Sequence, residues 1–455
     1  MFKKRSTYSL TLIPLIIILF LFVWLFTVIF EGEKPIAILD PLPEYLARNQ
    51  KFFVKVSDMK RGLKILKVSY SQGGRDITIF EKKFPFEGLL NKQGVHRFEK
   101  EIEFNPSKIR LAQGRVDLSI RVWDYSRRGG GDGNMTLARH KMTVDTMPPS
   151  IRAISRMHNV NRGGSGLVVY RTSSDTLESG VHVDGNFFPG FQVEGKEGTH
   201  VAYFAVPHNS SLNPSIYLWA KDKADNTTNA TFYYHIRRKR FKKSKINITD
   251  RFLKRMLPYF SFYEFGNEDN DIEKFLKINT VLRKADNETF FNLMKDTGPD
   301  KLWEGTFIRM KNAATMAKYA DHRSYFYKGE KVDEQTHLGI DLASLANSPV
   351  KAINNGKVLF AERNGIYGLT IVLDHGQGIA SLYGHLSSME VTTGQELKKG
   401  DVIGHSGQTG LAGGDHLHLS ILIHGVFVNP IEWWDAHWIE DNITKKLTLI
   451  NKLGK

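Results

Sequence analysis

The chain has 455 residues, too many for a single hydrophobic core, which indicates about two to four domains. Hydrophobic residues make up 41% and charged residues 24%, a balance typical of a folded protein and not of a disordered one. Cysteine is absent, which excludes disulfides and thiolate metal sites, so any metal must be held by His, Asp or Glu.

The formal net charge is +15, but the basic excess lies outside the C-terminal region. Between residues 337 and 435, five basic residues stand against nine acidic ones, a net charge of −4. A basic surface elsewhere suits an anionic partner. The sequence contains no recognisable nucleic-acid module, so nucleic acid is not expected as a partner.

Residues 1–31 are predicted to form a cytoplasmic tail and a transmembrane anchor. Lys3, Lys4 and Arg5 precede an uncharged run over residues 10–30, and about 20 apolar residues suffice to span a bilayer. The run exceeds the apolar core of a cleavable signal peptide and ends without a small-residue cleavage pattern. The positive-inside rule then predicts a single-pass inner-membrane protein, with its N-terminus in the cytoplasm and its bulk in the periplasm or extracytoplasmic space.

Two strand-rich segments follow, at residues 32–147 and 148–246, and each is predicted to be an immunoglobulin-like β-sandwich module. Alternating apolar and polar residues mark short strands at 52–56, 63–68, 116–123, 141–144, 166–170, 199–206 and 215–220. The turns after Trp123 and Trp219 look alike and resemble the final hairpin of bacterial immunoglobulin-like domains. The modules are interpreted either as a docking site for a cell-envelope protein or as a bare stalk.

Residues 237–245 form a dense basic run, interpreted either as a solvated linker or as a contact with an anionic polymer or membrane surface. A short helical connector is predicted over residues 247–305. Thr249 or Asp250 can cap its first helix, and apolar residues spaced three and four apart indicate further helices at 271–278 and 287–294. We expect this connector to brace or cover the functional site.

Three motifs near the C-terminus contain the residues suited to chemistry. His337 and Asp341 supply an imidazole and a carboxylate, both of which suit Zn²⁺, although such a pair also occurs by chance. His416 and His418 alternate along a strand-like run, so their side chains point to one face; a pair of surface histidines is the alternative. The third motif is Tyr383-Gly384-His385-Leu386.

The order and context of these motifs resemble the lysostaphin/LytM-type zinc endopeptidases of peptidoglycan, over about residues 318–434. Segments 394–404, 406–410 and 428–430 match the family as well. The resemblance implies a C-terminal, mostly antiparallel β metallopeptidase domain, which we assign to residues 306–440, followed by a tail over 441–455. The expected fold class is therefore multidomain and mainly β.

The resemblance also implies one Zn²⁺ ion per chain, held by His337, Asp341 and His418. It makes His385 and His416 the catalytic histidines beside the bound water and the substrate carbonyl. Three protein ligands and one open position are what a catalytic zinc needs. We expect His416 to act as the base and His385 to stabilise the oxyanion, although the sequence leaves this division open.

Four other positions have weaker expectations. His375 is expected to be structural, and His405 and His424 to lie at the surface. Tyr325 or Tyr327 is a candidate for an oxyanion contact, with ordinary packing as the alternative. The segment around His322 departs from the family's Gly-rich pattern, which leaves the groove wall and the substrate preference open.

The predicted function is a zinc-dependent endopeptidase that hydrolyses stem peptides or cross-links of peptidoglycan with a metal-activated water. One alternative is a catalytically silent LytM-type regulator that activates other wall hydrolases. Another is a wall-binding scaffold in which the β modules matter most. The complete ligand set, with both flanking histidines, favours the enzyme.

Overall fold

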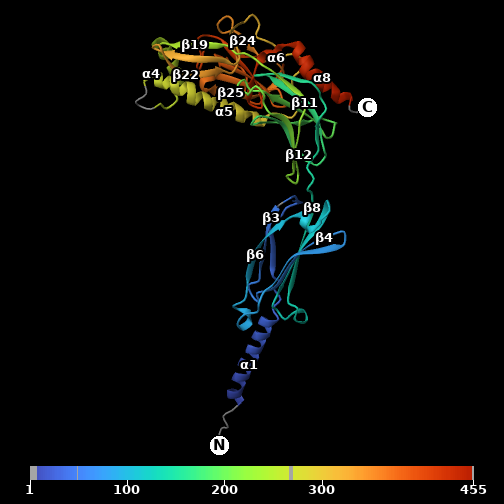
Figure 1. The fold of residues 1–455 in the computed structure, drawn as a ribbon. Helices are drawn as coiled ribbons and strands as arrows, with labels where there is room; N and C mark the ends of the chain where they lie inside the picture. The colour runs from blue at the N-terminus through green and yellow to red at the C-terminus, as the bar shows by residue number, and fades with distance from the viewer. Residues whose placement is uncertain (1–7, 49, 266–269, 453–455) are drawn as a thin grey trace. The chain divides into compact units, whose positions relative to one another are not determined.

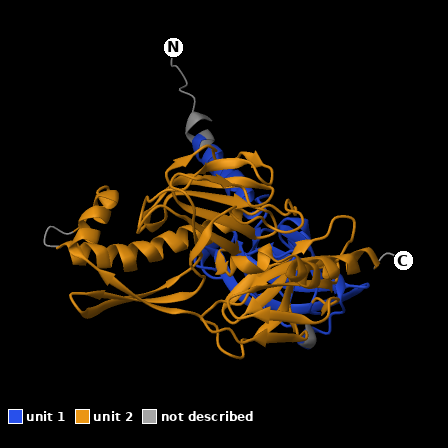
Figure 2. Ribbon diagram, turned by 90° about the horizontal axis from the view of Figure 1, so that it is seen from above, with its two compact units in different colours: residues 1–148, 223–226 blue, residues 149–222, 227–455 orange. Residues whose placement is uncertain are grey.

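The computed structural model describes residues 8–48, 50–265 and 270–452. The fold is mainly β and multidomain, as predicted (Figure 1). It divides into two compact units, coloured separately in Figure 2. Unit 1 comprises residues 1–148 and 223–226, and unit 2 comprises residues 149–222 and 227–455.

The chain begins with helix α1 (Tyr8–Ile29). Among the described residues, no helix is both long and apolar enough to cross a membrane. This finding contradicts the predicted anchor over residues 10–30 and the inner-membrane localisation derived from it. The predicted cytoplasmic residues Lys3, Lys4 and Arg5 lie outside the described residues.

Unit 1 contains two antiparallel-rich sheets that share one core. The larger sheet has the order β2-β8-β7-β4-β5, and the smaller has the order β1-β3-β6. Alternation explains the core, because Phe52, Val54 and Val56 on β3 are buried while their neighbours are not. The strands are β1 (Ile36–Asp40), β2 (Tyr45–Leu46), β3 (Gln50–Ser57), β4 (Leu63–Gln72), β5 (Arg75–Lys83), β6 (Arg97–Phe104), β7 (Gly114–Asp124) and β8 (Met135–Val144). The immunoglobulin-like character of this module stays a prediction.

Unit 2 begins with a second set of strands. They form the sheets β14-β15-β11-β9 and β13-β12-β16-β17 and the parallel pair β10-β18. The strands are β9 (Ile151–Ala153), β10 (His158–Asn161), β11 (Ser165–Thr172), β12 (Thr176–Val183), β13 (Asn186–Pro189), β14 (Phe191–Gln192), β15 (Thr199–Ala205), β16 (Ile216–Asp222), β17 (Thr227–Ala230) and β18 (Tyr234–Arg237). The strands expected near 170, 200 and 218 are all present.

The basic run over residues 237–245 does not form a free linker. Its end enters β19 (Lys243–Ile248), which pairs in parallel with β21 (Asp321–Tyr327). β21 in turn pairs with β22 (Glu330–His337), so this three-stranded sheet leads directly to the first expected metal ligand.

The predicted helices follow β19. Thr249 caps α3 (Asp250–Met256) by accepting a hydrogen bond from Phe252 N, and a 3₁₀ turn, η3 (Leu257–Phe260), extends it. α4 (Asp271–Lys277), a π-helical turn η4 (Ile278–Leu282) and α5 (Arg283–Leu293) form one continuous run that ends in η5 (Met294–Asp296). Phe275, Ile278 and Phe290 are fully buried, so these helices belong to the core of unit 2.

The C-terminal part is built on an eight-stranded sheet of order β20-β23-β31-β27-β26-β25-β29, with β32 paired to β31. All these pairings are antiparallel, as expected. The strands are β20 (Ala314–Ala317), β23 (Ile340–Ala343), β25 (Gly356–Asn364), β26 (Gly368–Asp374), β27 (Ile379–Leu386), β29 (Glu396–Leu397), β31 (Leu417–Ile423) and β32 (Val426–Val428). Strands between those of the large sheet in sequence form a smaller sheet of order β24 (Pro349–Lys351), β30 (Val402–His405) and β28 (Ser388–Met389). A 3₁₀ turn, η6 (Gly365–Tyr367), precedes β26.

The chain closes with α6 (Pro430–Trp434), α7 (Ala436–Ile439), the π-helical turn η7 (Glu440–Thr444) and α8 (Lys445–Lys452). One hydrophobic core runs through the second strand set, the helices and the large sheet, and includes Tyr203, Phe290 and Trp433. The domain boundaries expected at 246, 305 and 440 stay predictions, and the core is continuous across all three.

Candidate metal centre and catalytic groove

Neighbouring strands bring the three expected metal ligands together. His337 is the last residue of β22, and Asp341 lies on β23. In the antiparallel register of β23 and β31, Asp341 stands opposite His418. β31 also pairs with β27, and there Gly384 stands opposite His418, which places His385 next to the same point. Ligands 81 residues apart in sequence therefore meet through β-sheet register.

The three ligand atoms converge on one point. His337 Nε2 lies 2.8 Å from Asp341 Oδ1, His418 Nδ1 lies 3.0 Å from the same oxygen, and the two nitrogens are 3.0 Å apart. All three residues are buried. Burial lowers the pKa of His418 to about 4, so its ring is neutral at ordinary pH. Burial raises the pKa of Asp341, but the histidines around it lower that pKa more, to well below its usual range.

The outer nitrogens of the two rings fix where their protons lie. His337 Nδ1 is 3.0 Å from the carbonyl oxygen of Lys318, which only accepts, so Nδ1 carries the proton. Ser420 Oγ donates to the carbonyl oxygen of Leu338 at 2.8 Å and therefore accepts from His418 Nε2 at 3.0 Å. His337 consequently directs Nε2, and His418 directs Nδ1, at the carboxylate of Asp341 and at each other.

This donor set fits a zinc ion. Two imidazole nitrogens and one carboxylate oxygen are ligands that zinc binds readily, and here they converge on one point. Ligand atoms around a tetrahedral zinc with bonds of about 2.0 Å are about 3.3 Å apart, close to the separations seen here. Two imidazoles and one carboxylate also leave the fourth position open, which is the composition of a catalytic site and not of a closed structural one.

Gly339 lets the two motifs approach this closely. A Cβ atom on Gly339 would lie 2.4 Å from His418 Nε2 and 2.6 Å from Ser420 Oγ. Any larger residue would displace either the ligand or the serine that holds its tautomer. The glycine between His337 and Asp341 is thus required by the opposite strand and not by its own backbone conformation.

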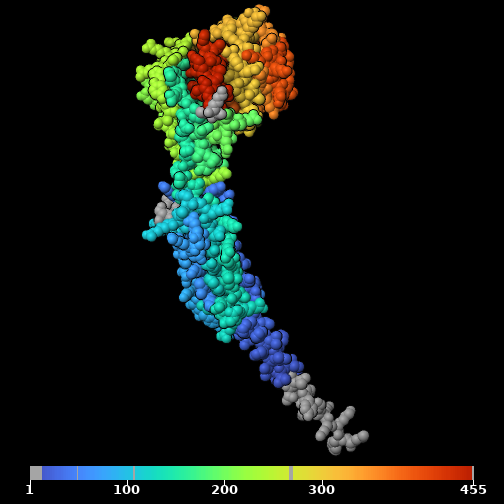
Figure 3. Space-filling model, turned by 90° about the vertical axis from the view of Figure 1, so that its right-hand side faces the viewer, coloured from blue at the N-terminus to red at the C-terminus, as the bar shows by residue number. Residues whose placement is uncertain are grey.

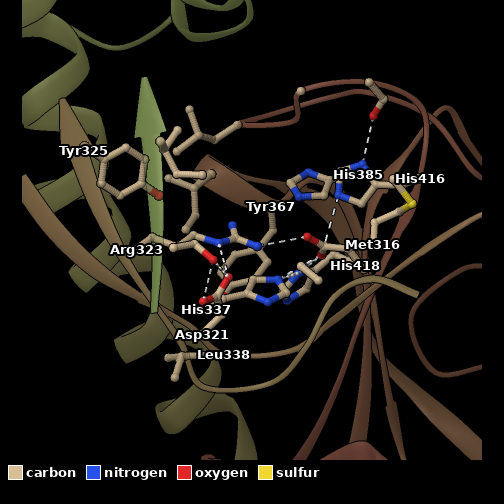
Figure 4. Close-up of a pocket in the computed structure, with 18 of the residues that line it drawn as sticks. Met316, Asp321, Arg323, Tyr325, His337, Leu338, Tyr367, His385, His416 and His418 are labelled. Carbon is tan, nitrogen blue, oxygen red and sulfur yellow. Dashed lines mark hydrogen bonds and ion pairs between the residues drawn. The ribbon is translucent and has the colours of Figure 1, made fainter. Parts of the chain in front are cut away.

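His385 and His416 flank the three ligands, as expected. Their ring centroids are 4.8 Å apart, and His385 is 5.7 Å from the ring of His418 (Figure 4). His385 Nδ1 donates to the carbonyl oxygen of Thr409 at 2.8 Å, and His416 Nδ1 donates to that of Gly414 at 2.8 Å. These contacts use Nδ1 of each ring, and His416 Nε2 lies 3.6 Å from Asp341 Oδ1. His385 also has a φ of 62°, a strained conformation of the kind that concentrates at functional sites.

Three contributors to the site were missed by the sequence analysis. Arg323 Nη2 donates to Asp341 Oδ2 at 3.2 Å, on the side of the carboxylate away from the histidines. Asp321 lies 3.6 Å from Arg323 Nε and accepts from Ser244 Oγ at 2.9 Å. The position of Ser420 could have been predicted, because it follows His418 by two residues on a strand and therefore lies on the same face of the sheet. Arg323 carried no comparable signal, since it reaches Asp341 from a different sheet.

The metal ligands lie in a groove of about 450 Å³. One wall comes from β19 and β21, including Ser244, Ile246 and Tyr325, and another from the helices through Phe252 and Phe275. Arg255 of α3 donates to the carbonyl oxygen of Gly413, in the loop that precedes His416, at 2.8 Å. The predicted helical connector thus forms part of the groove wall.

The weaker expectations have mixed outcomes. His375 is structural, as predicted: it is fully buried and contacts Asn355 O at 2.6 Å and Ser381 Oγ at 2.8 Å. The surface position expected for His424 is wrong, because the β31–β32 turn packs its ring against Phe188 and Phe191. Burial there lowers the pKa of His424 to about 4. Tyr327 donates to Asp250 Oδ1 at 2.7 Å, outside the groove, and Tyr325 packs on Phe275.

Comparison with known proteins concerns the C-terminal region. Residues 335–430 match peptidase family M23. The DD-carboxypeptidase/endopeptidase Mpg of Neisseria meningitidis serogroup B is 40% identical over 95 residues, which cover 21% of this chain and 22% of Mpg. The murein hydrolase activator EnvC of Escherichia coli K12 is 36% identical over 95 residues, 21% of this chain and 23% of EnvC. The solved catalytic domain of lysostaphin from Staphylococcus simulans is 28% identical, with a TM-score of 0.24, and covers 28% of this chain and 96% of that domain.

The chain thus spans about a fifth of the length of the curated relatives that it matches. The M23 family is zinc-dependent, which agrees with the donor set of His337, Asp341 and His418. The matched segment contains all five histidine and aspartate residues of the site. Residues 335–430 form a peptidase M23 domain of the lysostaphin/LytM type.

Proposed function

We propose that this protein is a zinc-dependent endopeptidase that hydrolyses peptide bonds in peptidoglycan, in stem peptides or cross-links. The observation that carries the proposal is the convergence of three ligand atoms at an open groove with two further histidines beside it. A structural site would need a fourth ligand, and the described residues around this point supply three.

The metal site would be formed by His337, Asp341 and His418. A zinc ion bound there supplies Lewis acidity, which lowers the pKa of a water molecule and polarises a carbonyl group. Arg323 holds the outer oxygen of Asp341 and thereby keeps its inner oxygen directed at the two histidines. Ser420 and the carbonyl oxygen of Lys318 keep both ligand rings in the required tautomer.

His416 is the proposed base. Its Nδ1 donates to the carbonyl oxygen of Gly414, and its Nε2 lies 3.6 Å from the inner oxygen of Asp341. Burial lowers the pKa of His416, but its contacts with Asp341 raise that pKa more, to above its usual value. In the neutral ring, Nε2 is an acceptor within reach of a water molecule next to the ligands. The ring of His385 lies beside that of His416, and burial lowers its pKa to well below the usual range, so its Nε2 donates to the developing oxyanion only after the ring gains a proton.

Peptidoglycan is the proposed substrate because the relatives point to it. Mpg is named as a carboxypeptidase and endopeptidase and EnvC as a murein hydrolase activator. An elongated groove between a β-sheet and helices also suits an extended peptide. The two β modules remain proposed docking sites for a cell-envelope protein.

A regulator without catalysis is the second candidate, because EnvC carries the name of an activator. The intact ligand set supports the enzyme instead, since an activator has no need to keep three metal-ligand atoms together. Metal analysis separates the two: the enzyme should bind about one zinc per chain, and the regulator should bind none.

Incubation of the purified protein with zinc and isolated sacculi tests the proposal directly. We expect released muropeptides whose analysis identifies the cleaved bond, and no release by His418→Ala. Absence of cleavage by a protein that contains zinc, or equal cleavage by the variant, would refute it. Sacculus binding that persists after loss of the M23 domain, without any cleavage by the full chain, would favour the scaffold.

A further inference from the structure

A second pocket, of about 910 Å³, lies in unit 2 and shares no lining residue with the histidine groove. Its floor is the parallel pair β10 and β18, and its walls are α7, η7 and α8. Figure 3 shows the C-terminal helices, in red, beside the green strands of the second module. The function proposed above makes no use of this pocket.

One wall of the pocket contains a buried cation. Lys446 of α8 is 4% exposed, and its Nζ donates to the carbonyl oxygen of Leu167 at 3.0 Å. That oxygen lies on β11 beyond the end of its pairing with β9. An ammonium group has three N–H donors, and the described residues give this one a single acceptor and no carboxylate partner. Burial lowers the pKa of Lys446 to about 8, which leaves the group mostly charged at neutral pH.

Two more cations line the pocket without an ion-pair partner among the described residues, namely Arg156 and Arg237, both exposed. The carboxylates nearby already have partners. Asp441 lies 2.6 Å from Lys445 Nζ, and Asp435 caps α7 by accepting from His437 N at 2.9 Å. Three unpaired cations therefore face a pocket whose acidic groups are engaged elsewhere, which is the arrangement of an anion site.

The rest of the lining suits a ligand with a ring or an aliphatic surface next to its anion. The ring of Trp438 packs on Trp433 at 5.5 Å and remains partly exposed, and Met157 is 68% exposed. The half-buried Asn159 adds an amide that can bind hydroxyl or acetamido groups. The wall between Trp438 and Lys446 is π-helical, a distortion that is frequent at functional sites.

We propose that this pocket binds a carboxylate-bearing muropeptide segment of peptidoglycan, with the carboxylate held by Lys446, Arg156 and Arg237 and the sugar or aliphatic part against Trp438. The choice of ligand rests on the proposed function; the anion site itself rests on the pocket. A second contact with the polymer on the same compact unit as the groove strengthens binding of long substrates and leaves cleavage of a short peptide unchanged.

Calorimetric titration of the full chain with a disaccharide–tetrapeptide muropeptide tests the site. Lys446→Met and Arg237→Gln should each weaken binding about tenfold or more. The matched controls Lys452→Met, on the exposed end of α8, and Arg240→Gln, in the same basic run but outside the pocket, should bind like the wild type. Amidation of the ligand's carboxylates should reduce affinity as much as Lys446→Met does.

A glycerol-phosphate polymer provides the alternative anion. Equal or tighter binding of that polymer, with the same response to Lys446→Met, would overturn the choice of a carboxylate ligand. Arg237→Gln guards against a folding artefact, because its side chain is exposed. Full affinity in Arg237→Gln together with lower thermal stability in Lys446→Met would overturn the site and leave Lys446 as a structural cap of Leu167.

Kinetics separates this inference from the proposed function. On sacculi, Lys446→Met should raise KM without changing kcat, and cleavage of a short peptide should be unaffected. If no form of the protein cleaves peptidoglycan while muropeptide binding still depends on Lys446, the proposed function fails and the pocket stands. If the wild type cleaves and Lys446→Met binds and cleaves identically, the pocket inference fails and the function stands.

Discussion

Two buried clusters of potential metal ligands, one in each unit, differ in how their lone pairs are used. In unit 2, His337, Asp341 and His418 direct three ligand atoms at one point. In unit 1, Glu31, Asp58 and Asp124 also bring ligand atoms within 4.8 Å of one another, and all three residues are buried. Proximity and burial therefore do not distinguish the two clusters.

Hydrogen-bond donors do distinguish them. Asp58 Oδ1 accepts from three backbone N–H groups, of Lys60, Arg61 and Gly62, at 2.7–3.1 Å. Asp124 accepts from the backbone and side chain of Asn134 at 2.7 and 2.8 Å. The carboxylates of unit 1 thus accept backbone hydrogen bonds that organise turns, whereas the inner oxygen of Asp341 in unit 2 contacts the ring nitrogens of His337 and His418. The chemistry of the donor set is therefore a better guide to a metal centre than proximity and burial.

Removal of a ligand should have the largest effect. His418→Ala eliminates one of three ligand atoms, so we expect loss of bound zinc and a fall of peptidase activity to background. His405→Ala is the matched control, because His405 pairs with Glu390 near the surface and does not line the groove. Metal analysis and muropeptide release measure both results. Zinc retained near one equivalent in His418→Ala would show that the convergent geometry does not hold the metal.

Loss of a flanking histidine should be next. His416→Ala should lower kcat about 10²- to 10⁴-fold, the usual contribution of a general base, while zinc stays bound. His385→Ala should do the same if it stabilises the oxyanion. Steady-state kinetics with parallel metal analysis separates these roles from ligation. Loss of zinc in either variant would show that the substituted histidine is itself a zinc ligand.

A substitution in the acidic cluster of Glu31, Asp58 and Asp124 should lower the stability of unit 1 without changing peptidase activity. Asp58→Ala leaves three backbone N–H groups without their acceptor, so we expect unit 1 to lose about 2–4 kcal/mol of stability. Hydrogen exchange of β3 and β4 amides measures this loss in the full chain, and activity per folded molecule should not change. Stabilisation of the wild type by millimolar calcium, absent from Asp58→Ala, would show that this cluster also binds a cation.

The outer support of the metal centre should have a smaller effect. Arg323→Met removes the donor on Asp341 Oδ2 while keeping most of the side-chain volume. Loss of such a supporting contact typically costs 10- to 100-fold in metal affinity or activity, and we expect a value in that range. Competition with a zinc chelator measures the affinity. An unchanged affinity would mean that β-sheet register alone orients Asp341.

The pH dependence of unit 1 should give the smallest signal. Burial raises the pKa of Asp124 and of Glu31 in the folded state above their unfolded values. Protonation of these two carboxylates therefore favours the folded state. The stability that it contributes to unit 1 is fully present below about pH 4 and is lost as the pH rises through the raised pKa values. Hydrogen exchange of β7 amides between pH 4 and 8 should show the decline. An increase in the stability of unit 1 over this pH range would mean that hydrogen bonds and nearby cations outweigh the effect of burial on these carboxylates.

Local patterns determined much of what could be predicted. Alternation along β3 and β7 identified those strands, because successive residues of a strand point to opposite faces of the sheet. Thr249 identified the start of α3, because a cap acts within three residues. The site was predicted from the resemblance of three short motifs, around His337, His385 and His418, to a known family, since each motif is local even though the motifs are far apart.

Tertiary structure alone decided the features that depend on distant partners. The tautomers of His337 and His418 follow from Lys318 and Ser420, and the support of Asp341 comes from Arg323 on another sheet. The burial of His424 and Lys446 depends on the second module packing against the C-terminal region. Hydropathy alone predicted a membrane anchor, whereas among the described residues no helix is both long and apolar enough to cross a membrane. Sequence patterns report neighbours along the chain, whereas proton positions and burial are set by whichever atoms the fold brings next to a side chain.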